Sequence, residues 1–179
     1  MFRTEKFGEV TVSDLLKFDQ KTLLEFFGNA IEKTEAFTGK IFEKLPQHPQ
    51  KEHALAHLRN AQALLEARKY FAVNRECAKA LLATFGVSQT HIKRCEEEAQ
   101  WIAREVLRSI EPEDISNLDK ERILEVVTQD IIVAYPRLMV EGYIYEIENF
   151  RFSNETVVQM VEKYSTQIRL KLAEGGKEH

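Results

Sequence analysis

Apolar residues recur at alternating steps of three and four along most of this chain, and the clearest run lies between residues 92 and 110. Residues at this spacing share one face of a single α-helix. An amphipathic helix must pack its apolar face against other helices, so the pattern predicts an all-α fold. An apolar face carries no reactive group, so this pattern says little about the chemistry of the protein. The six residues of the run are Ile92, Cys95, Ala99, Ile102, Val106 and Ile110.

Length and composition favour one helical domain. The chain has 179 residues, of which 44% are hydrophobic and only 7 are Gly and 4 are Pro. This is enough apolar material for one core, and it contains few helix breakers. We predict a single up-and-down bundle of about five long amphipathic helices. Residues 1–12 would form an N-terminal arm, 111–119 a long polar loop and 174–179 a flexible tail.

The first long helix is predicted to begin at Gln20, because Asp19 and Thr22 suit its N-terminal cap. It should end at Pro46, whose ring clashes with the preceding helical turn. One predicted apolar face runs along its whole length. The residues of this face are Leu23, Phe27, Ile31, Thr34, Phe37, Ile41 and Leu45.

The second helical unit spans residues 51–85, and its apolar face changes near residues 68–70. Either one curved helix or a hairpin of two helices explains this change, and the sequence leaves both open. Gly86 is a suitable C-terminal cap, and Ser88 opens the helix that carries the run described above. The short connections predict that the first three helices are antiparallel neighbours.

The last part of the chain is predicted to form two more helices. The first is capped by Asp119, is kinked at Pro136 and continues to Ile147, since a proline removes only one backbone hydrogen bond. The second begins at Asn154 and ends at the glycines at 175 and 176.

Charge and cysteine content set limits on the class of protein. A net charge of −4 gives no general attraction to nucleic acid or to an anionic membrane. Cys77 and Cys95 are too few and too far apart for a disulfide framework, so we expect reduced core residues. The N-terminus lacks the apolar core of a signal peptide, and no run is long enough to span a membrane. These observations predict a cytoplasmic location and no membrane partner.

Catalytic motifs do not stand out. The sequence has no glycine-rich phosphate loop, no nucleophile elbow and no paired C-x-x-C motif, so no cofactor is predicted and a non-enzymatic role is favoured. His53 and His57 are one helical turn apart and are the nearest approach to a metal site, although a third ligand would have to come from elsewhere, with Glu52 and His91 as candidates. Alternatively, both histidines simply flank an apolar face.

Three basic residues, Arg68, Arg75 and Lys79, are spaced to share one helical face. Such a row suits phosphates or an acidic partner. The alternatives are a solvated face, or ion pairs with the acidic run Glu96, Glu97 and Glu98 of the next helix.

Aromatic residues at two other places are candidates for a partner interface, because such surfaces are rich in exposed aromatics. The first group is Tyr143, Tyr145, Phe150 and Phe152, which could instead pack onto a neighbouring helix. The second place is Trp101, which falls either at the edge of the core or at an interface.

Residues 54–82 resemble one tetratricopeptide unit, with Tyr70, Ala80 and Leu81 at fitting positions. The first half is about two residues too long, and no second copy follows at that period. The same segment, extended to His91, resembles helical bundles of the HEPN type. Those bundles use an Arg followed four to six residues later by His, which this sequence lacks. No functional residue is therefore transferred from either family.

Two functional hypotheses follow. The first is a non-enzymatic interaction or regulatory module that presents a helical surface to a protein partner and self-associates as a homodimer. The second is a nucleic-acid-associated or nuclease-associated bundle, in which the basic row binds phosphates and His57 or His91 transfers protons.

Overall fold

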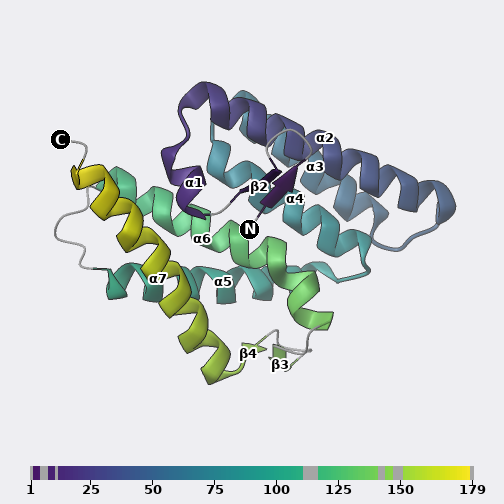
Figure 1. Ribbon diagram of the computed structural model, residues 1–179. Coiled ribbons are helices and arrows are strands. Elements are labelled where there is room, and N and C mark those ends of the chain that lie inside the picture. Colours follow the sequence, from purple (N-terminus) through teal and green to yellow (C-terminus); the bar gives the residue numbers. More distant parts are fainter. Residues whose placement is uncertain are drawn as a thin grey trace.

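The chain folds into helices joined by short connections, together with two small hairpins (Figure 1). The computed structural model describes residues 2–4, 8–10, 12–110, 117–140, 144–146 and 151–177, and it describes side chains at 10, 14–110, 120–135 and 152–170. The all-α class is confirmed. The helices in these ranges are α1 (Val12–Lys17), α2 (Gln20–Lys44), α3 (Lys51–Glu66), α4 (Tyr70–Thr84), α5 (Gln89–Ser109), α6 (Asn117–Val140) and α7 (Asn154–Lys177).

The hairpins are short antiparallel strand pairs. In the predicted N-terminal arm, β1 (Phe2–Thr4) pairs with β2 (Gly8–Val10). The second pair is β3 (Ile144–Glu146) with β4 (Arg151–Phe152). The predicted helix to Ile147 is therefore too long: α6 runs through Pro136 as one helix but ends at Val140. The β-branched and aromatic residues that follow favour extended backbone.

Helix α6 lies at the centre of the fold. Every side chain from Val126 to Ile132 is buried, which means that this stretch is enclosed on all sides. A helix with no solvated face must be surrounded by other elements. Helix α6 packs against α1, α4 and α5, and the core is built around it.

The predicted start and stop signals of α2, α4 and α5 are confirmed. The carboxylate of Asp19 accepts a hydrogen bond from the backbone N–H of Thr22 at 2.8 Å. Ser88 Oγ accepts one from the N–H of His91 at 3.3 Å. Gly86 follows α4 with φ of 91°, a left-handed conformation that costs glycine little. Helix α6 begins at Asn117, earlier than the predicted cap at Asp119.

Residues 51–85 form a hairpin of two helices and not one curved helix. The turn between α3 and α4 contains Arg68 at φ of 61°. The N–H of Arg68 donates to the carbonyl of Leu65 at 3.0 Å, and that of Lys69 donates to Leu64 at 2.9 Å. Chain reversal at this turn places α4 beside both α3 and α2.

The predicted apolar face of α2 is correct only in its N-terminal half. Leu23, Phe27, Ile31 and Thr34 are buried there. In the C-terminal half the core side of the helix is instead formed by Thr38 and Phe42. Three predicted core residues lie outside this buried side: Phe37 is 39% exposed, Leu45 is 54% exposed and Ile41 is half-buried.

The packing of α5 and α7 also differs from the prediction. Helix α5 packs mainly against α6 and α7 and makes few contacts with α4, so the first three predicted helices are not a simple antiparallel row. Helix α7 crosses α5 obliquely (Figure 1). It continues through both glycines to Lys177, so residues 174–177 extend the helix and the predicted tail is too long. Two glycines weaken a helix without breaking it.

Candidate functional site

Charged and polar side chains from four helices meet in a partly buried cluster, which we call the four-helix network. Most of these side chains are less than one-fifth exposed. The network contains two of the three residues of the predicted basic row. Its members are His57 on α3, Arg75, Glu76 and Lys79 on α4, Gln89 and Glu96 on α5, and Glu125 on α6.

Each cation of the network is paired with carboxylates from its own or neighbouring helices. Lys79 Nζ lies 2.5 Å from Glu96 Oε2 and 3.3 Å from Glu76 Oε1. The guanidinium of Arg75 pairs with Glu125 and lies 3.7 Å from the same oxygen of Glu96. Two cations therefore face three carboxylates, and Glu96 joins α5 to both basic residues of α4.

His57 bridges two further members of the network. Its Nδ1 lies 2.7 Å from Glu76 Oε2, and its Nε2 lies 2.9 Å from Oε1 of Gln89. A carboxylate only accepts hydrogen bonds, so the Nδ1 proton points to Glu76. His57 thereby connects α3 to α4 and α5.

Glu76 is held in its charged form by these neighbours. Its partial burial alone would raise the pKa of the carboxyl group. The hydrogen bond from His57 and the positive charge of Lys79 outweigh that effect, so the pKa of Glu76 lies below its ordinary value. The network is thus a charged structural element that links helices.

The contacts of Arg75 and Lys79 decide between the three interpretations of the basic row. Arg75 and Lys79 lie together, but their side chains are only 16% and 13% exposed and are taken up by carboxylates. The predicted pairing with the acidic run is confirmed for Glu96. Arg68 lies in the exposed α3–α4 turn, away from this helical face. The three residues therefore do not form one exposed phosphate-binding surface.

The histidine pair is not arranged as a metal site. His53 is exposed, whereas both ring nitrogens of His57 are engaged by Glu76 and Gln89. Among the described residues, no group of three or more His, Cys, Asp or Glu side chains converges in the way a metal ion requires. The described helices also include no segment long and apolar enough to cross a membrane.

The four aromatic candidates have different outcomes. The prediction of a partner interface is wrong for Phe152. This residue is only 6% exposed and packs edge-on against Tyr135, with ring centroids 6.1 Å apart, so it belongs to the core. Pairing of β4 with β3 holds this residue against α6. The side chains of Tyr143, Tyr145 and Phe150 lie outside the described residues, and their role stays a prediction.

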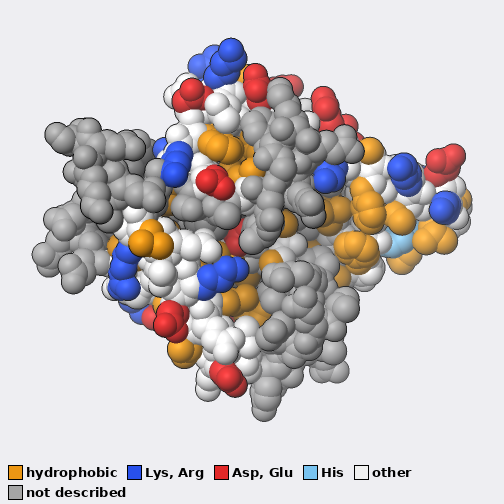
Figure 2. Space-filling model, viewed as in Figure 1, with side chains coloured by type: hydrophobic (Ala, Val, Ile, Leu, Met, Phe, Trp, Pro, Cys, Tyr) orange, Lys and Arg blue, Asp and Glu red, His pale blue; other side chains and the backbone are white. Residues whose placement is uncertain are grey.

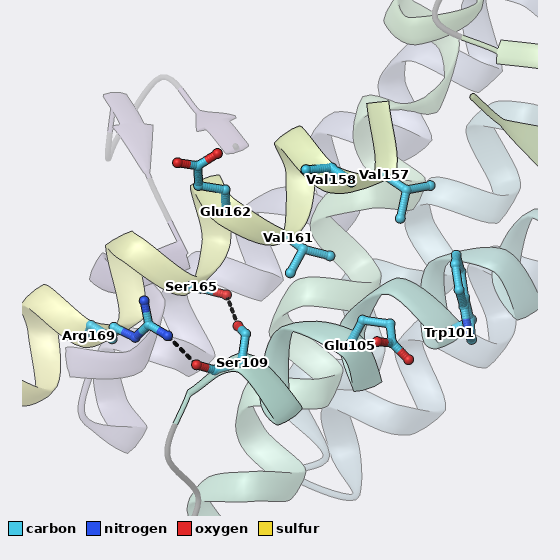
Figure 3. A pocket seen from close by; sticks show the side chains of 9 residues that line it. All are labelled: Trp101, Glu105, Ser109, Val157, Val158, Val161, Glu162, Ser165 and Arg169. Atoms are coloured by element: carbon cyan, nitrogen blue, oxygen red, sulfur yellow. Dashed lines mark hydrogen bonds between the residues drawn. The ribbon is translucent and has the colours of Figure 1, made fainter. Parts of the chain in front are cut away.

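A groove lies between α5 and α7 (Figure 3). It has a volume of about 380 Å³. Val157 and Val161 of α7 point into the space between the helices, and Trp101 of α5 stands at one end (Figure 3). Trp101 is 42% exposed, and Val158 on the rim is 63% exposed. The groove therefore offers apolar surface to solvent.

The opposite end of this groove is closed by polar contacts. The hydroxyl groups of Ser109 and Ser165 are hydrogen-bonded to each other, and the guanidinium of Arg169 donates to the backbone carbonyl of Ser109 (Figure 3). This contact supplies a donor to an unpaired carbonyl at the end of α5. Glu105 and Glu162 also line the groove. These contacts join α7 to α5 at this end of the groove.

The sequence identified one residue of this groove, Trp101, but not the groove itself. The α7 residues Val157 and Val161 follow an ordinary helical stripe, which predicts burial. The oblique crossing of α7 over α5 leaves them half-buried instead. Such a crossing depends on contacts between distant segments and leaves no local signal in the sequence.

The two cysteines are core residues and not nucleophiles. Both are buried and free of disulfides, as predicted. Burial raises the pKa of the Cys77 thiol to about 12 and that of Cys95 well above its ordinary value. A thiol held in its neutral form is a poor nucleophile.

Comparison of the chain with protein-family models, with curated proteins and with solved structures gives no match.

Proposed function

We propose that this protein is a non-enzymatic interaction module and that the α5–α7 groove receives an apolar helical segment of a protein partner. The observation that carries this proposal is the exposure of Trp101 and Val158 beside a groove of about 380 Å³. Exposing a tryptophan and a valine to water is unfavourable, and tryptophan is enriched among the residues that dominate binding energies.

A helix is the segment that suits this groove. Two packed helices leave an elongated channel, and an amphipathic helix fits its apolar residues into such a channel at steps of three and four. Glu162 lines the groove and would pair with a basic residue on the flank of the partner helix, whereas Glu105 already pairs with Arg108. Arg169 at the far end would mark where the bound helix stops.

The nucleic-acid alternative has less support, because the charges of Arg75 and Lys79 are already matched by carboxylates. We also propose a reducing, cytoplasmic setting, which suits two free buried cysteines. A second copy of the chain is another candidate occupant of the groove, and light scattering of the purified protein distinguishes a homodimer from a monomer.

The test is a selection of amphipathic helical peptides from a display library against the native chain. Val158→Asp adds a charge to the rim of the groove at an exposed position, so it should not affect folding. Leu170→Asp is the matched control, because Leu170 is 61% exposed on the same helix but does not line the groove.

We expect selected peptides to bind the native chain and the Leu170→Asp variant equally and to lose affinity for Val158→Asp by about tenfold or more. Equal binding to all three proteins would place the partner surface elsewhere. Failure to select any peptide would contradict the proposal.

A further inference from the structure

A second exposed apolar surface lies where the C-terminal half of α2 approaches the end of α4, and we call it the α2–α4 surface. Figure 2 shows hydrophobic side chains gathered over this part of the molecule. Phe37 and Phe85 are 39% and 58% exposed, yet their rings contact each other with centroids 5.8 Å apart. The surface consists of Phe37, Ile41 and Leu45 from α2 and its C-terminal cap, with Phe85 from the cap of α4.

Core packing accounts for Ile41, which is half-buried, but not for the exposed side chains of Phe37, Leu45 and Phe85. The C-terminal half of α2 already contributes Thr38 and Phe42 to the interior. Phe37, Ile41 and Leu45 form an additional i, i+4, i+8 series beside that buried side. Contiguous exposed apolar residues are uncommon on a soluble protein and mark interaction sites. The spacing is that of one helix packing against another.

Lysines follow one edge of the surface. At 100° per residue, Lys40 and Lys44 both fall within about 60° of Phe37, on the side away from the core. Both are exposed. The exposed acidic residues of this half of α2 are Glu32, Glu35 and Glu43, and all three lie further round the helix. The charge directly beside the apolar series is therefore positive.

We propose that the α2–α4 surface binds an amphipathic helix of a partner protein whose apolar face is flanked by acidic residues. Phe37 and Phe85 supply the apolar contacts, and the lysine edge selects acidic flanks. A second copy of this chain fits less well, because a two-fold contact sets a patch against itself and would bring the lysine edges together. This surface is distinct from the α5–α7 groove, so the protein would join two partner segments.

The test uses two designed peptides with the same leucine face, one with glutamates and one with lysines on its flanks. Binding of each labelled peptide to the full-length chain is measured by fluorescence anisotropy. The variants are Phe85→Ser, which removes an exposed ring, and Lys40→Glu with Lys44→Glu, which reverses the edge. Leu24→Ser and Lys21→Glu are matched controls, since both residues are exposed on α2 far from the surface.

The glutamate peptide should bind the native chain and both controls, and it should bind each surface variant about tenfold more weakly. The lysine peptide should bind at least about tenfold more weakly than the glutamate peptide, and this preference should shrink at high salt. Equal binding of the two peptides would overturn the acidic assignment. Concentration-dependent dimerisation that Phe85→Ser abolishes would overturn it in favour of a second copy.

Discussion

Lys79 Nζ lies 2.5 Å from Glu96 Oε2, and this ion pair ties α4 to α5 within the four-helix network. Lys79 is only 13% exposed, so its removal leaves Glu96 with only the guanidinium of Arg75, 3.7 Å away, and leaves Glu76 with only His57. We expect Lys79→Met to lower the free energy of unfolding by about 1–3 kcal/mol, as measured by urea denaturation.

Lys93→Met is the control for this substitution, because Lys93 is exposed on α5. Its effect should stay within about 0.5 kcal/mol. Equal effects of the two substitutions would show that the network contributes nothing specific to stability.

The low pKa of Glu76 predicts a pH dependence of stability. A carboxyl group whose pKa is lower in the folded state stabilises the fold above its unfolded pKa, and this contribution is lost as pH falls through the folded value. The difference in unfolding free energy between the native chain and Glu76→Gln should therefore shrink as the pH falls from the ordinary pKa of glutamate through the lower pKa of the folded state. Glu97→Gln, at an exposed position of α5, should give no such change. A difference independent of pH would contradict this explanation.

Gln129 provides a stabilising prediction. Its side chain is fully buried in α6, and neither its amide nitrogen nor its oxygen has a hydrogen-bond partner among the described residues. Burying an unpaired amide is unfavourable, so Gln129→Met should raise the unfolding free energy by about 1 kcal/mol. Gln159→Met at an exposed position of α7 should leave the melting temperature unchanged. A lower melting temperature for Gln129→Met would show that the amide is paired in solution.

The backbone conformation of Arg68 predicts that two substitutions at this position change stability in opposite directions. Its φ of 61° is unfavourable for any residue with a Cβ atom and especially for a β-branched one. Arg68→Gly should stabilise the chain by up to about 1 kcal/mol, whereas Arg68→Val should destabilise it. Thermal unfolding measures both. Destabilisation by glycine would mean that the exposed side chain contributes more than the backbone conformation costs.

Local signals in the sequence predicted much of this fold. Asp19, Ser88 and Gly86 marked helix ends because capping depends on residues only a few positions apart. Every member of the run from Ile92 to Ile110 is buried, since its spacing fits one helical face and no other.

The remaining features depend on contacts between distant segments. Two apolar series lie side by side on α2, and only the position of α3 and α4 decides that Phe42 is buried while Phe37 is exposed. The burial of Arg75 and Lys79 could not be predicted from the sequence either, because it depends on the contact between Arg75 and Glu125 of α6. The α5–α7 groove arises from a crossing geometry that no short pattern encodes.

The most direct test of the interaction-module account is the fluorescence of Trp101, the only tryptophan in the chain, during titration with a peptide selected against the native protein. Trp101 stands at one end of the groove and is partly exposed, so a helix seated there would shield it from water. We expect a saturable blue shift of the Trp101 emission that is lost in Val158→Asp and kept in Leu170→Asp. Unchanged emission while the peptide binds would contradict the proposed function.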